Sequence, residues 1–372
     1  MEKTEKARPC ARRDRRDGAR EHRRSSGSLR AVLADELTVI VPAYNEADSI
    51  TDTVKSLLSQ TTPPYRIIVV DDCSTDDTAD IASDLGVEVV TPPTNTGSKA
   101  GAQTFALRQV ETDYVMAIDA DTTLETNAIE LLAEVFDDPT VAAASGFVVP
   151  RHVHTVWERG RYVEYLYSFS FHKRVQDHYD KPLISSGCFS IYRTDVLCEI
   201  GGWSNRTMAE DMDLTWSLYE RGWRVRFVPE AVCYPIEPHS LAFLSKQLRR
   251  WSHGFVQNVR LHWRGLLGQR YLRSVVAIGF FDAIVAPPLT LIGLPLLAWL
   301  VNPWFLLGYV IDLPVVAIPV LVGARRRGEV RTAMVSLVSY FPLRLANCWF
   351  MLRAVVTELV LRRPLLVYEK GH

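Results

Sequence analysis

The sequence predicts an α/β domain with a mostly parallel sheet, followed by C-terminal transmembrane helices. Short apolar runs rich in β-branched residues alternate with amphipathic segments between residues 37 and 149. Long apolar runs fill the chain from about residue 274. The charge divides in the same way, because residues 31–240 carry 15 Lys and Arg against 33 Asp and Glu, whereas residues 241–372 carry 16 against 5. The chain of 372 residues therefore joins an acidic globular region to a basic, apolar one.

Five apolar runs in the first region are expected to be strands. They are nearly continuous in apolar residues, as in parallel sheets that helices cover on both faces. The runs span residues 38–44, 66–72, 87–91, 114–121 and 141–149. The segments between these runs predict helices. The first has an apolar face formed by Ile50, Val54, Leu57 and Leu58. The second is capped near Ser74, and the next two start near Ser98 and Thr126. Ligands of such a sheet gather at the carboxyl ends of its strands.

Three apolar runs follow, at residues 274–301, 304–323 and 332–361. The first two are each long enough to cross a bilayer of about 30 Å. Arg344 and Arg353 interrupt the third, which therefore either faces a protein-lined cavity or lies at the interface, so that two or three spans are predicted. The positive-inside rule assigns the basic cluster 325–327 to the cytosol. We expect a multi-pass protein of the inner (plasma) membrane whose acidic domain faces the cytoplasm.

Acidic side chains stand where two of the predicted strands end. Asp119 and Asp121 alternate at the end of one strand, so both carboxylates can reach one site, and hard oxygen ligands select Mg²⁺ or Mn²⁺. A solvated loop is the alternative. Asp71 and Asp72 end a second strand, where carboxylates can accept hydrogen bonds from a nucleoside, or simply cap the next helix.

Two further segments carry candidate chemistry. Glu210 and Asp211 start a predicted helix, where one carboxylate could act as a general base, or both could simply complement the helix dipole. Residues 241–263 predict an amphipathic helix beside the membrane, in which Arg250 could neutralise a diphosphate and Trp251 could stack on a sugar ring or belong to the core. The histidines show no metal-ligand spacing, and we expect structural or solvent-exposed roles for them.

These motifs, in this order, resemble the family 2 inverting glycosyltransferases, and most closely their membrane-bound branch of hyaluronan, chitin, cellulose and poly-N-acetylglucosamine synthases. The similarity covers residues 37 to about 263 and the apolar runs beyond. The matching segments are VIVPAYNE (39–46), VVDDCSTDDT (69–78), NTGSKAGA (95–102), AIDADT (118–123), SGCFSIYR (186–193), GGW…AEDMDL (201–214), RGWRVRFVPEA (221–231) and QLRRW (247–251). Any one of them could arise by chance, but the ordered set is specific.

The resemblance implies a nucleotide-binding domain of the A-type glycosyltransferase fold, with a UDP-sugar donor. Residues implied to hold the nucleoside are Pro42, Ala43, Tyr44, Glu46 and Asp72. Lys99 would lie near the ribose or phosphates, although Ser98 adds one residue to the usual spacing before it. Asp119 and Asp121 would contact the sugar phosphate and the metal. Asp211 would be the base supported by Glu210, and the implied residues closing over the diphosphate and acceptor are Gln247, Arg250 and Trp251.

The sequence thus predicts a membrane-anchored hexosyl- or N-acetylhexosaminyltransferase that moves a sugar from a nucleotide sugar to a lipid-linked or polysaccharide hydroxyl. Its expected regions are a basic disordered tail (1–35), the catalytic domain (36–240), an interfacial helix with the QxxRW motif (241–273) and the membrane region (274–372). The expected partners are the donor, the acceptor, the membrane and possible further subunits, but not nucleic acid. A sugar-phosphate nucleotidyltransferase and a non-catalytic membrane scaffold are the alternatives, and single or repeated transfer remains open.

Overall fold

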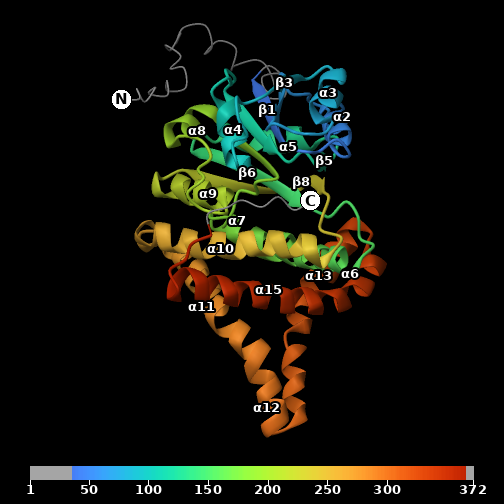
Figure 1. Cartoon of the computed structure of the whole chain (residues 1–372), viewed down its shortest axis with the longest axis vertical. Helices are drawn as coiled ribbons and strands as arrows, with labels where there is room; N and C mark the ends of the chain where they lie inside the picture. Colours follow the sequence, from blue (N-terminus) through green and yellow to red (C-terminus); the bar gives the residue numbers. More distant parts are fainter. Residues whose placement is uncertain (1–35, 366–372) are drawn as a thin grey trace. The chain divides into compact units, whose positions relative to one another are not determined.

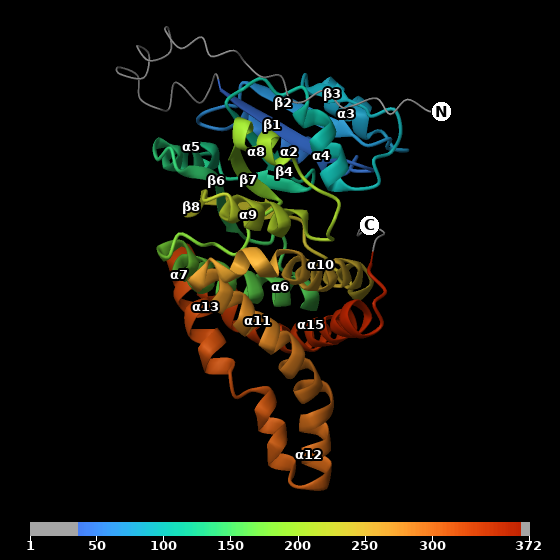
Figure 2. The same ribbon diagram turned by 90° about the vertical axis from the view of Figure 1, so that its left-hand side faces the viewer.

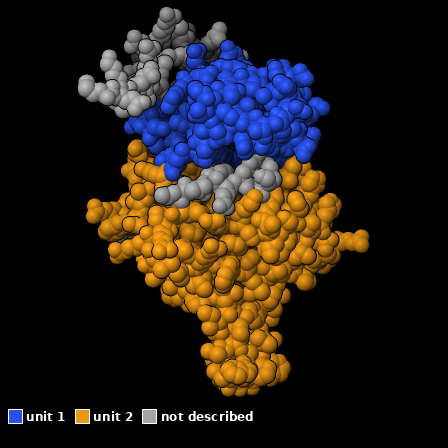
Figure 3. Space-filling model, in the orientation of Figure 1, with its two compact units in different colours: residues 1–146, 185–205, 230–233 blue, residues 147–184, 206–229, 234–372 orange. Residues whose placement is uncertain are grey.

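The computed structural model describes residues 36–365, and the expected basic tail at 1–35 lies outside them. Contacts between Cα atoms divide the chain into two compact units, drawn in different colours in Figure 3. Unit 1 comprises Met1–Gly146, Ser185–Asn205 and Glu230–Cys233. Unit 2 comprises Phe147–Ile184, Arg206–Pro229 and Tyr234–His372.

A mixed sheet of eight strands forms the centre of the α/β region (Figure 1). Its strand order is β3-β2-β1-β4-β7-β6-β8-β5. The first four strands in this order pair in parallel, whereas β7 is antiparallel to both β4 and β6. The strands are β1 (Leu37–Ala43), β2 (Arg66–Asp71), β3 (Glu88–Val90), β4 (Tyr114–Ile118), β5 (Thr122–Leu124), β6 (Val141–Val148), β7 (Phe189–Arg193) and β8 (Arg224–Pro235). The α/β fold with a mostly parallel sheet, predicted from the sequence, is confirmed.

The strand order changes direction between β1 and β4. The chain proceeds from β1 outward to β2 and β3, and then returns to the other side of β1 to form β4. In open α/β sheets, such a switch point opens a crevice at the carboxyl ends of the strands, and ligands bind there. All five residues of β4 are buried, as are six of the seven in β1, because both faces of these strands are covered.

The helices of unit 1 connect these strands, and two sequence predictions about them need correction. Leu58 is 49% exposed, whereas the other three apolar residues assigned to its face are fully buried. The helix expected near Ser74 begins at Thr78, because residues 74–78 hydrogen bond to the loop after β1 instead. The helices are α2 (Ile50–Leu58), α3 (Thr78–Asp84), α4 (Lys99–Leu107), α5 (Ala128–Ala133) and α8 (Thr194–Ile200).

Unit 2 is mainly helical. Its longest helix, α10, packs against α9, α11 and α15, and the buried apolar residues Leu244 and Leu248 of α10 contact Leu343 of α15. The main helices are α6 (Val156–Tyr167), α7 (Lys173–His178), α9 (Glu210–Glu220), α10 (Leu241–Leu267), α11 (Arg270–Pro288), α12 (Leu294–Leu300), α13 (Leu313–Arg327), α14 (Val330–Ser336) and α15 (Tyr340–Val355).

Three helical segments of unit 2 are long and apolar enough to cross a membrane, namely Arg270–Leu300, Pro303–Arg327 and Val330–Val360. Figures 1 and 2 show the first two as a hairpin, in which α11 and α12 run away from α10 and α13 returns. The third segment contains α15, which runs beside α10 (Figure 1). Its Arg344, which interrupts the apolar run, pairs with Asp312 at the start of α13, so neither charge lacks a partner.

Candidate active site

The loop after β1 is held against the loop after β2 by a set of hydrogen bonds within unit 1. The N–H groups of Asn45 and Glu46 donate to the hydroxyls of Ser74 and Thr78 at 3.0 and 2.8 Å. The Asn45 side chain in turn accepts a hydrogen bond from the Thr75 N–H at 2.8 Å. These bonds fix the backbone around Tyr44, whose neighbour Asn45 has a positive φ of 53°. Of the predicted nucleoside residues, Pro42 and Ala43 therefore end β1, and Tyr44 and Glu46 lie on the hydrogen-bonded loop that follows it at the switch point.

Asp72 organises the next loop along the sheet edge. Its backbone N–H donates to the Ala43 carbonyl at 2.8 Å, which joins the ends of β2 and β1. One carboxylate oxygen accepts the Thr96 N–H at 2.7 Å, and the other accepts the Thr96 hydroxyl at 2.9 Å. Asp72 thus positions the loop leading to α4. Sequence reasoning missed Thr96, although it lies within the matching segment at 95–102.

The helix α4 begins with a side-chain cap. Ser98, the extra residue in the sequence motif, accepts a hydrogen bond from the Gly101 N–H at 3.0 Å. A side chain on Gly101 would contact Thr96, since an added Cβ would lie 2.8 Å from that residue. Ser98 therefore starts the helix and leaves Lys99 in its first turn.

Lys99 and Asp119 form an ion pair at the carboxyl end of β4. The Lys99 ammonium also donates to the Gly187 carbonyl at 2.9 Å, and its side chain is only 13% exposed. The turn that carries Asp119 is anchored from both sides, because the Ala120 carbonyl accepts the Thr53 hydroxyl at 2.8 Å and the Asp119 N–H donates to Cys188 at 3.3 Å. A cation and a carboxylate are thus held at the strand end next to β1.

The donor set for a metal in this region consists of carboxylates alone. Asp119 and Asp121 flank Ala120 after β4, and Asp121 accepts the Thr122 hydroxyl at 3.1 Å. Within residues 36–365, no group of three or more His, Cys, Asp or Glu side chains could hold a metal ion. Two carboxylates form a partial ligand set for a hard cation, and the oxygen atoms of a bound diphosphate could complete it. The residues therefore fit a metal that binds together with a nucleotide.

The predicted base lies in unit 2. Glu210 and Asp211 are the first residues of α9, as the sequence predicts, and Ala209 before them provides no side-chain cap. The Glu210 side chain is buried, whereas Asp211 is partly exposed. An Asp211 carboxylate oxygen accepts the N–H of the next residue at 2.8 Å. Asp211 is therefore fixed at the positive end of a helix while part of it still faces solvent.

The QxxRW residues lie in the first half of α10. The side-chain oxygen of Gln247 is buried and has no hydrogen-bond partner within the described part of the chain. The Arg161 guanidinium lies over the ring of Trp251, 4.4 Å from its centroid. Trp251 also packs beside the Leu244 and Leu248 cluster. Of the two roles considered for Trp251, the structure thus shows packing in the core, together with a contact to a buried cation, and stacking on a sugar ring stays a prediction.

A histidine that the sequence did not single out lies between two carboxylates of unit 2. His262 of α10 contacts Asp213 through Nε2 at 2.7 Å and Glu220 through Nδ1 at 2.8 Å. Burial alone would lower the pKa of His262, but these hydrogen bonds raise it above its usual value of 6.5. Burial alone would raise the pKa of Asp213, but hydrogen bonds from His262 and Arg206 lower it. The histidine is 49 and 42 residues from its partners, so no local spacing could reveal the contact.

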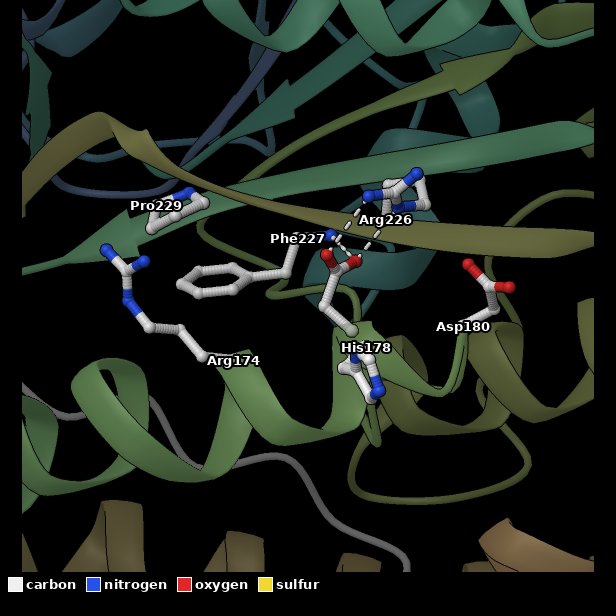
Figure 4. Close-up of a pocket in the computed structure, with 7 residues that line it drawn as sticks. Arg174, His178, Asp180, Arg226, Phe227 and Pro229 are labelled. Atoms are coloured by element: carbon white, nitrogen blue, oxygen red, sulfur yellow. Dashed lines mark hydrogen bonds and ion pairs between the residues drawn. The ribbon is translucent and has the colours of Figure 1, made fainter.

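A pocket elsewhere in unit 2 contains none of the predicted site residues. In this pocket, Asp177 accepts hydrogen bonds from Arg226 and from the Phe227 N–H. Figure 4 labels Arg226 and Phe227 among the lining residues. Its lining residues are Arg174, Asp177, His178, Asp180, Arg226, Phe227 and Pro229. In unit 1, the structure brings together the residues at the ends of β1, β2 and β4, and in unit 2 it positions the α9 and α10 residues.

Comparisons with known proteins agree with this arrangement. Residues 38–201 match the family described as glycosyl transferase family 2. The poly-beta-1,6-N-acetyl-D-glucosamine synthase of Staphylococcus aureus (strain MSSA476) is 30% identical over 243 residues, which are 63% of this chain and 59% of that protein. The synthase of the same name from Staphylococcus epidermidis is 29% identical over 223 residues, covering 59% of this chain and 54% of that protein. The chain thus spans less than two thirds of the length of these relatives.

A solved structure shares the fold. The mannosyltransferase of Pyrobaculum calidifontis, in complex with GDP-Man and Mn²⁺, aligns over 87% of each chain with a TM-score of 0.55 and 21% sequence identity. This similarity extends to the A-type glycosyltransferase domain, which confirms the predicted fold class. The sequence match places residues 38–201 in glycosyl transferase family 2, and the similarity to the synthases extends over 63% of the chain.

Proposed function

We propose that this glycosyltransferase is a membrane-anchored inverting enzyme that transfers N-acetylglucosamine from UDP-N-acetylglucosamine to a hydroxyl of a glycan or lipid-linked acceptor. The observation that carries this proposal is the group of polar side chains at the switch point of unit 1. There, the loop after β1, Asp72 after β2 and the Lys99–Asp119 pair after β4 lie at the carboxyl ends of three adjacent parallel strands. The names of the two staphylococcal relatives support the choice of sugar.

The residues proposed to bind the donor belong to unit 1. The uracil and ribose would lie against the end of β1 at Pro42 and Ala43, the loop that continues to Glu46, and Asp72. Each carboxylate oxygen of Asp72 has a lone pair beyond the bond to Thr96. Lys99 would exchange part of its interaction with Asp119 for the diphosphate. In this way, charges that neutralise each other in the free enzyme would turn toward a bound nucleotide sugar.

The residues proposed to act on the acceptor belong to unit 2. Asp211 would take the proton of the acceptor hydroxyl as that oxygen attacks the anomeric carbon, with Glu210 supporting it. The new bond forms as the bond between the anomeric carbon and the phosphate oxygen breaks, and UDP leaves with the electron pair. Attack from the face opposite the leaving group inverts the α-linked sugar to a β product. Arg250 would approach the departing diphosphate, and the unpartnered oxygen of Gln247 would accept a hydrogen bond from a substrate hydroxyl.

We further propose that the cofactor is Mn²⁺ or Mg²⁺ held by Asp121 and Asp119 together with the donor diphosphate. Such a cation would supply positive charge beside the departing diphosphate. The two neighbouring carboxylates, which make a partial ligand set for a hard cation, support an ion that binds together with the nucleotide. Asp119, which the ion pair with Lys99 neutralises, would become a ligand as Lys99 turns to the phosphates.

The hairpin of unit 2 supports a cytoplasmic orientation of the catalytic domain. Arg270 and Arg273 begin its first arm, and the arginine cluster at 325–327 ends its second, so both basic ends lie at the open end of the hairpin. The closed end carries the highly exposed Trp299 and Trp304, at 81% and 74% exposure. Basic residues favour the cytoplasmic side, and tryptophan favours the interface, so the open end of the hairpin, and with it the α/β residues that precede it in the chain, would be cytoplasmic.

A donor screen tests the proposed function directly. The full chain, purified in detergent, is incubated with Mn²⁺, a panel of UDP- and GDP-sugars, and β-1,6-linked N-acetylglucosamine oligosaccharides or membrane lipid extract. We expect UDP release and a product 203 mass units heavier per sugar, a value that follows from the mass of an N-acetylhexosamine residue, with a β linkage by NMR. Release of UDP from a different UDP-sugar would show that this sugar, rather than N-acetylglucosamine, is transferred. No transfer from any nucleotide sugar would refute the proposal, and release of pyrophosphate from UTP and a sugar phosphate would favour a nucleotidyltransferase.

A further inference from the structure

A stripe of residues along α10 holds the segment that carries the proposed base. Gly254, Asn258 and His262 recur every four residues, so they share one face of α10. This face lies against residues 206–213 and against α9. We refer to the three residues as the α9 clamp.

The first two contacts of the clamp fix the backbone before Glu210. A Cβ on Gly254 would lie 2.6 Å from the Ala209 Cβ, so only glycine allows the two segments to approach this closely. The buried Asn258 amide donates to the Ala209 carbonyl at 3.0 Å and to the Thr207 hydroxyl at 3.2 Å. The non-helical segment at 207–209, which leads directly into α9 and the base, is thereby tied to α10.

The third contact fixes α9 itself. Asp213 and Glu220 are seven residues apart, which places them on one side of α9, two turns from each other. His262, only 3% exposed, contacts both carboxylates, at 2.7 and 2.8 Å. Ionised carboxylates only accept hydrogen bonds, so both ring nitrogens must donate, and the clamp therefore requires the imidazolium form.

The surroundings of His262 hold this charged form. Asp213 and Glu220 face it from α9, and Trp216 of the same helix meets its ring edge-on, with 5.7 Å between ring centroids. Arg206, in the segment before α9, donates to both oxygens of Asp213, at 2.7 and 2.6 Å. On α10, the neighbouring clamp residue Asn258 is uncharged. Two cations and two carboxylates thus balance in this cluster.

We infer that His262 is a positioning residue of this glycosyltransferase, which keeps Asp211 oriented for proton abstraction only while both ring nitrogens donate to α9. This inference rests on the proposed function of Asp211. Deprotonation of the His262 imidazolium would leave one of the two carboxylates without a hydrogen bond from His262 and would allow α9 to shift against α10. A shift of about 1 Å in a catalytic group can cost on the order of 10²-fold in rate.

The inference has a defined pH dependence. The pKa of His262 is raised in the folded protein. Both hydrogen bonds from His262 to α9 are therefore fully formed below the usual histidine pKa of 6.5, and one of them is lost as the pH rises through the raised pKa. Turnover should therefore decline on the alkaline side. The variant Glu220→Gln removes one of the two carboxylates that raise the pKa of His262, so it should move this decline to lower pH.

The experiment measures kcat and KM for UDP release from UDP-N-acetylglucosamine against pH, with Mn²⁺ and β-1,6-linked N-acetylglucosamine oligosaccharides, in the full-length protein. For His262→Gln, we expect kcat to fall between about 10-fold and 10²-fold with the donor KM unchanged, and the alkaline decline due to this group to disappear. For Glu220→Gln, which retains the histidine, we expect the decline at lower pH than in the wild type. The thermal unfolding temperature of each variant shows whether the variant is still folded.

His253→Gln is the matched control. His253 is also buried on α10 and contacts a carboxylate, but its partner is Glu358, at 2.7 Å, rather than a residue of α9. The His253→Gln variant should lose thermal stability, while its kcat should decline at the same alkaline pH as in the wild type. An unshifted decline in Glu220→Gln, or an equal shift in His253→Gln, would overturn the clamp but leave the proposed function intact. Absence of UDP release by the wild type would refute the proposed function, and the clamp, which rests on it, would fall too.

Discussion

Removing the buried arginine beneath Trp251 should destabilise unit 2 strongly. Arg161 is 1% exposed, and its guanidinium donates to Glu237 at 3.0 Å and to the Tyr165 hydroxyl at 2.5 Å. The Tyr165 hydroxyl donates to the second oxygen of Glu237 at 2.6 Å. The carboxylate of Glu237 is itself only 3% exposed. Arg161→Met would therefore leave an ionised carboxylate buried with a single donor.

The expected cost follows from these contacts. Breaking a buried ion pair by removing one partner costs about 3–5 kcal/mol in free energy of unfolding, because the remaining charge keeps its desolvation penalty. The lost stacking of the guanidinium on Trp251 adds about 0.5–2 kcal/mol. Arg161 also pairs with Glu164, but that side chain is 26% exposed and can be solvated. Replacing the buried partner as well, in Arg161→Met with Glu237→Gln, removes the buried uncompensated charge. The double variant should therefore cost less than the sum of the single variants, by about 2–3 kcal/mol.

The assay is urea unfolding of the detergent-solubilised protein, followed by near-UV circular dichroism. Arg159→Met is the control, because Arg159 lies on the same helix, α6, and is partly exposed. It should change the free energy of unfolding by no more than about 0.5 kcal/mol. If the two single effects add to the double effect within about 0.5 kcal/mol, Arg161 and Glu237 do not depend on each other, and the reasoning is wrong.

Three further predictions concern packing, pH and metal. Gly146→Ala should destabilise the protein by about 1–3 kcal/mol in thermal or urea unfolding, because an added Cβ would lie 2.3 Å from the Phe189 ring; unchanged stability would contradict this packing. Burial would raise the pKa of Glu158, but backbone N–H donors at the start of α6 lower it below 4.5. The ionised Glu158 side chain therefore stabilises the folded protein fully above pH 4.5, and this contribution is lost as the pH falls through the lowered pKa. Glu158→Gln should therefore lower the melting temperature at pH 7 more than at pH 3. Titration calorimetry should find Mn²⁺ binding much tighter with UDP than without it, and equal affinities would exclude a shared site.

Much of the α/β architecture follows from local sequence. The apolar runs that become β1, β2 and β4 are continuous because both faces of these strands are buried, so they could be located without a structure. Asp72, Asp119 and Asp121 could be assigned to one sheet edge for the same reason, since parallel strands end on the same side. The start of α9 at Glu210 was also predictable from its acidic first turn.

The contacts between distant segments could not be predicted in this way. Nothing in the local pattern shows that Asp72 binds Thr96 or that Lys99 pairs with Asp119, because each depends on how a loop returns to the sheet edge. The buried face of α10 likewise changes from apolar Leu244 and Leu248 to polar Asn258 and His262. Periodicity of apolar residues reports only the first half of this face, because the second half is buried against polar partners.

The central claim is that unit 1 binds the nucleotide sugar while Asp211 of unit 2 performs the proton transfer. It is tested most directly by measuring donor affinity and turnover on the same preparations of Asp211→Asn, Asp121→Ala and the control Asp195→Asn, which alters an exposed aspartate on α8. We predict that Asp211→Asn keeps the wild-type Kd for UDP-N-acetylglucosamine and loses at least ~10² in kcat, that Asp121→Ala loses metal-dependent donor binding, and that the control retains both. Wild-type turnover by Asp211→Asn, or donor binding by Asp121→Ala with an unchanged Kd, would contradict the claim.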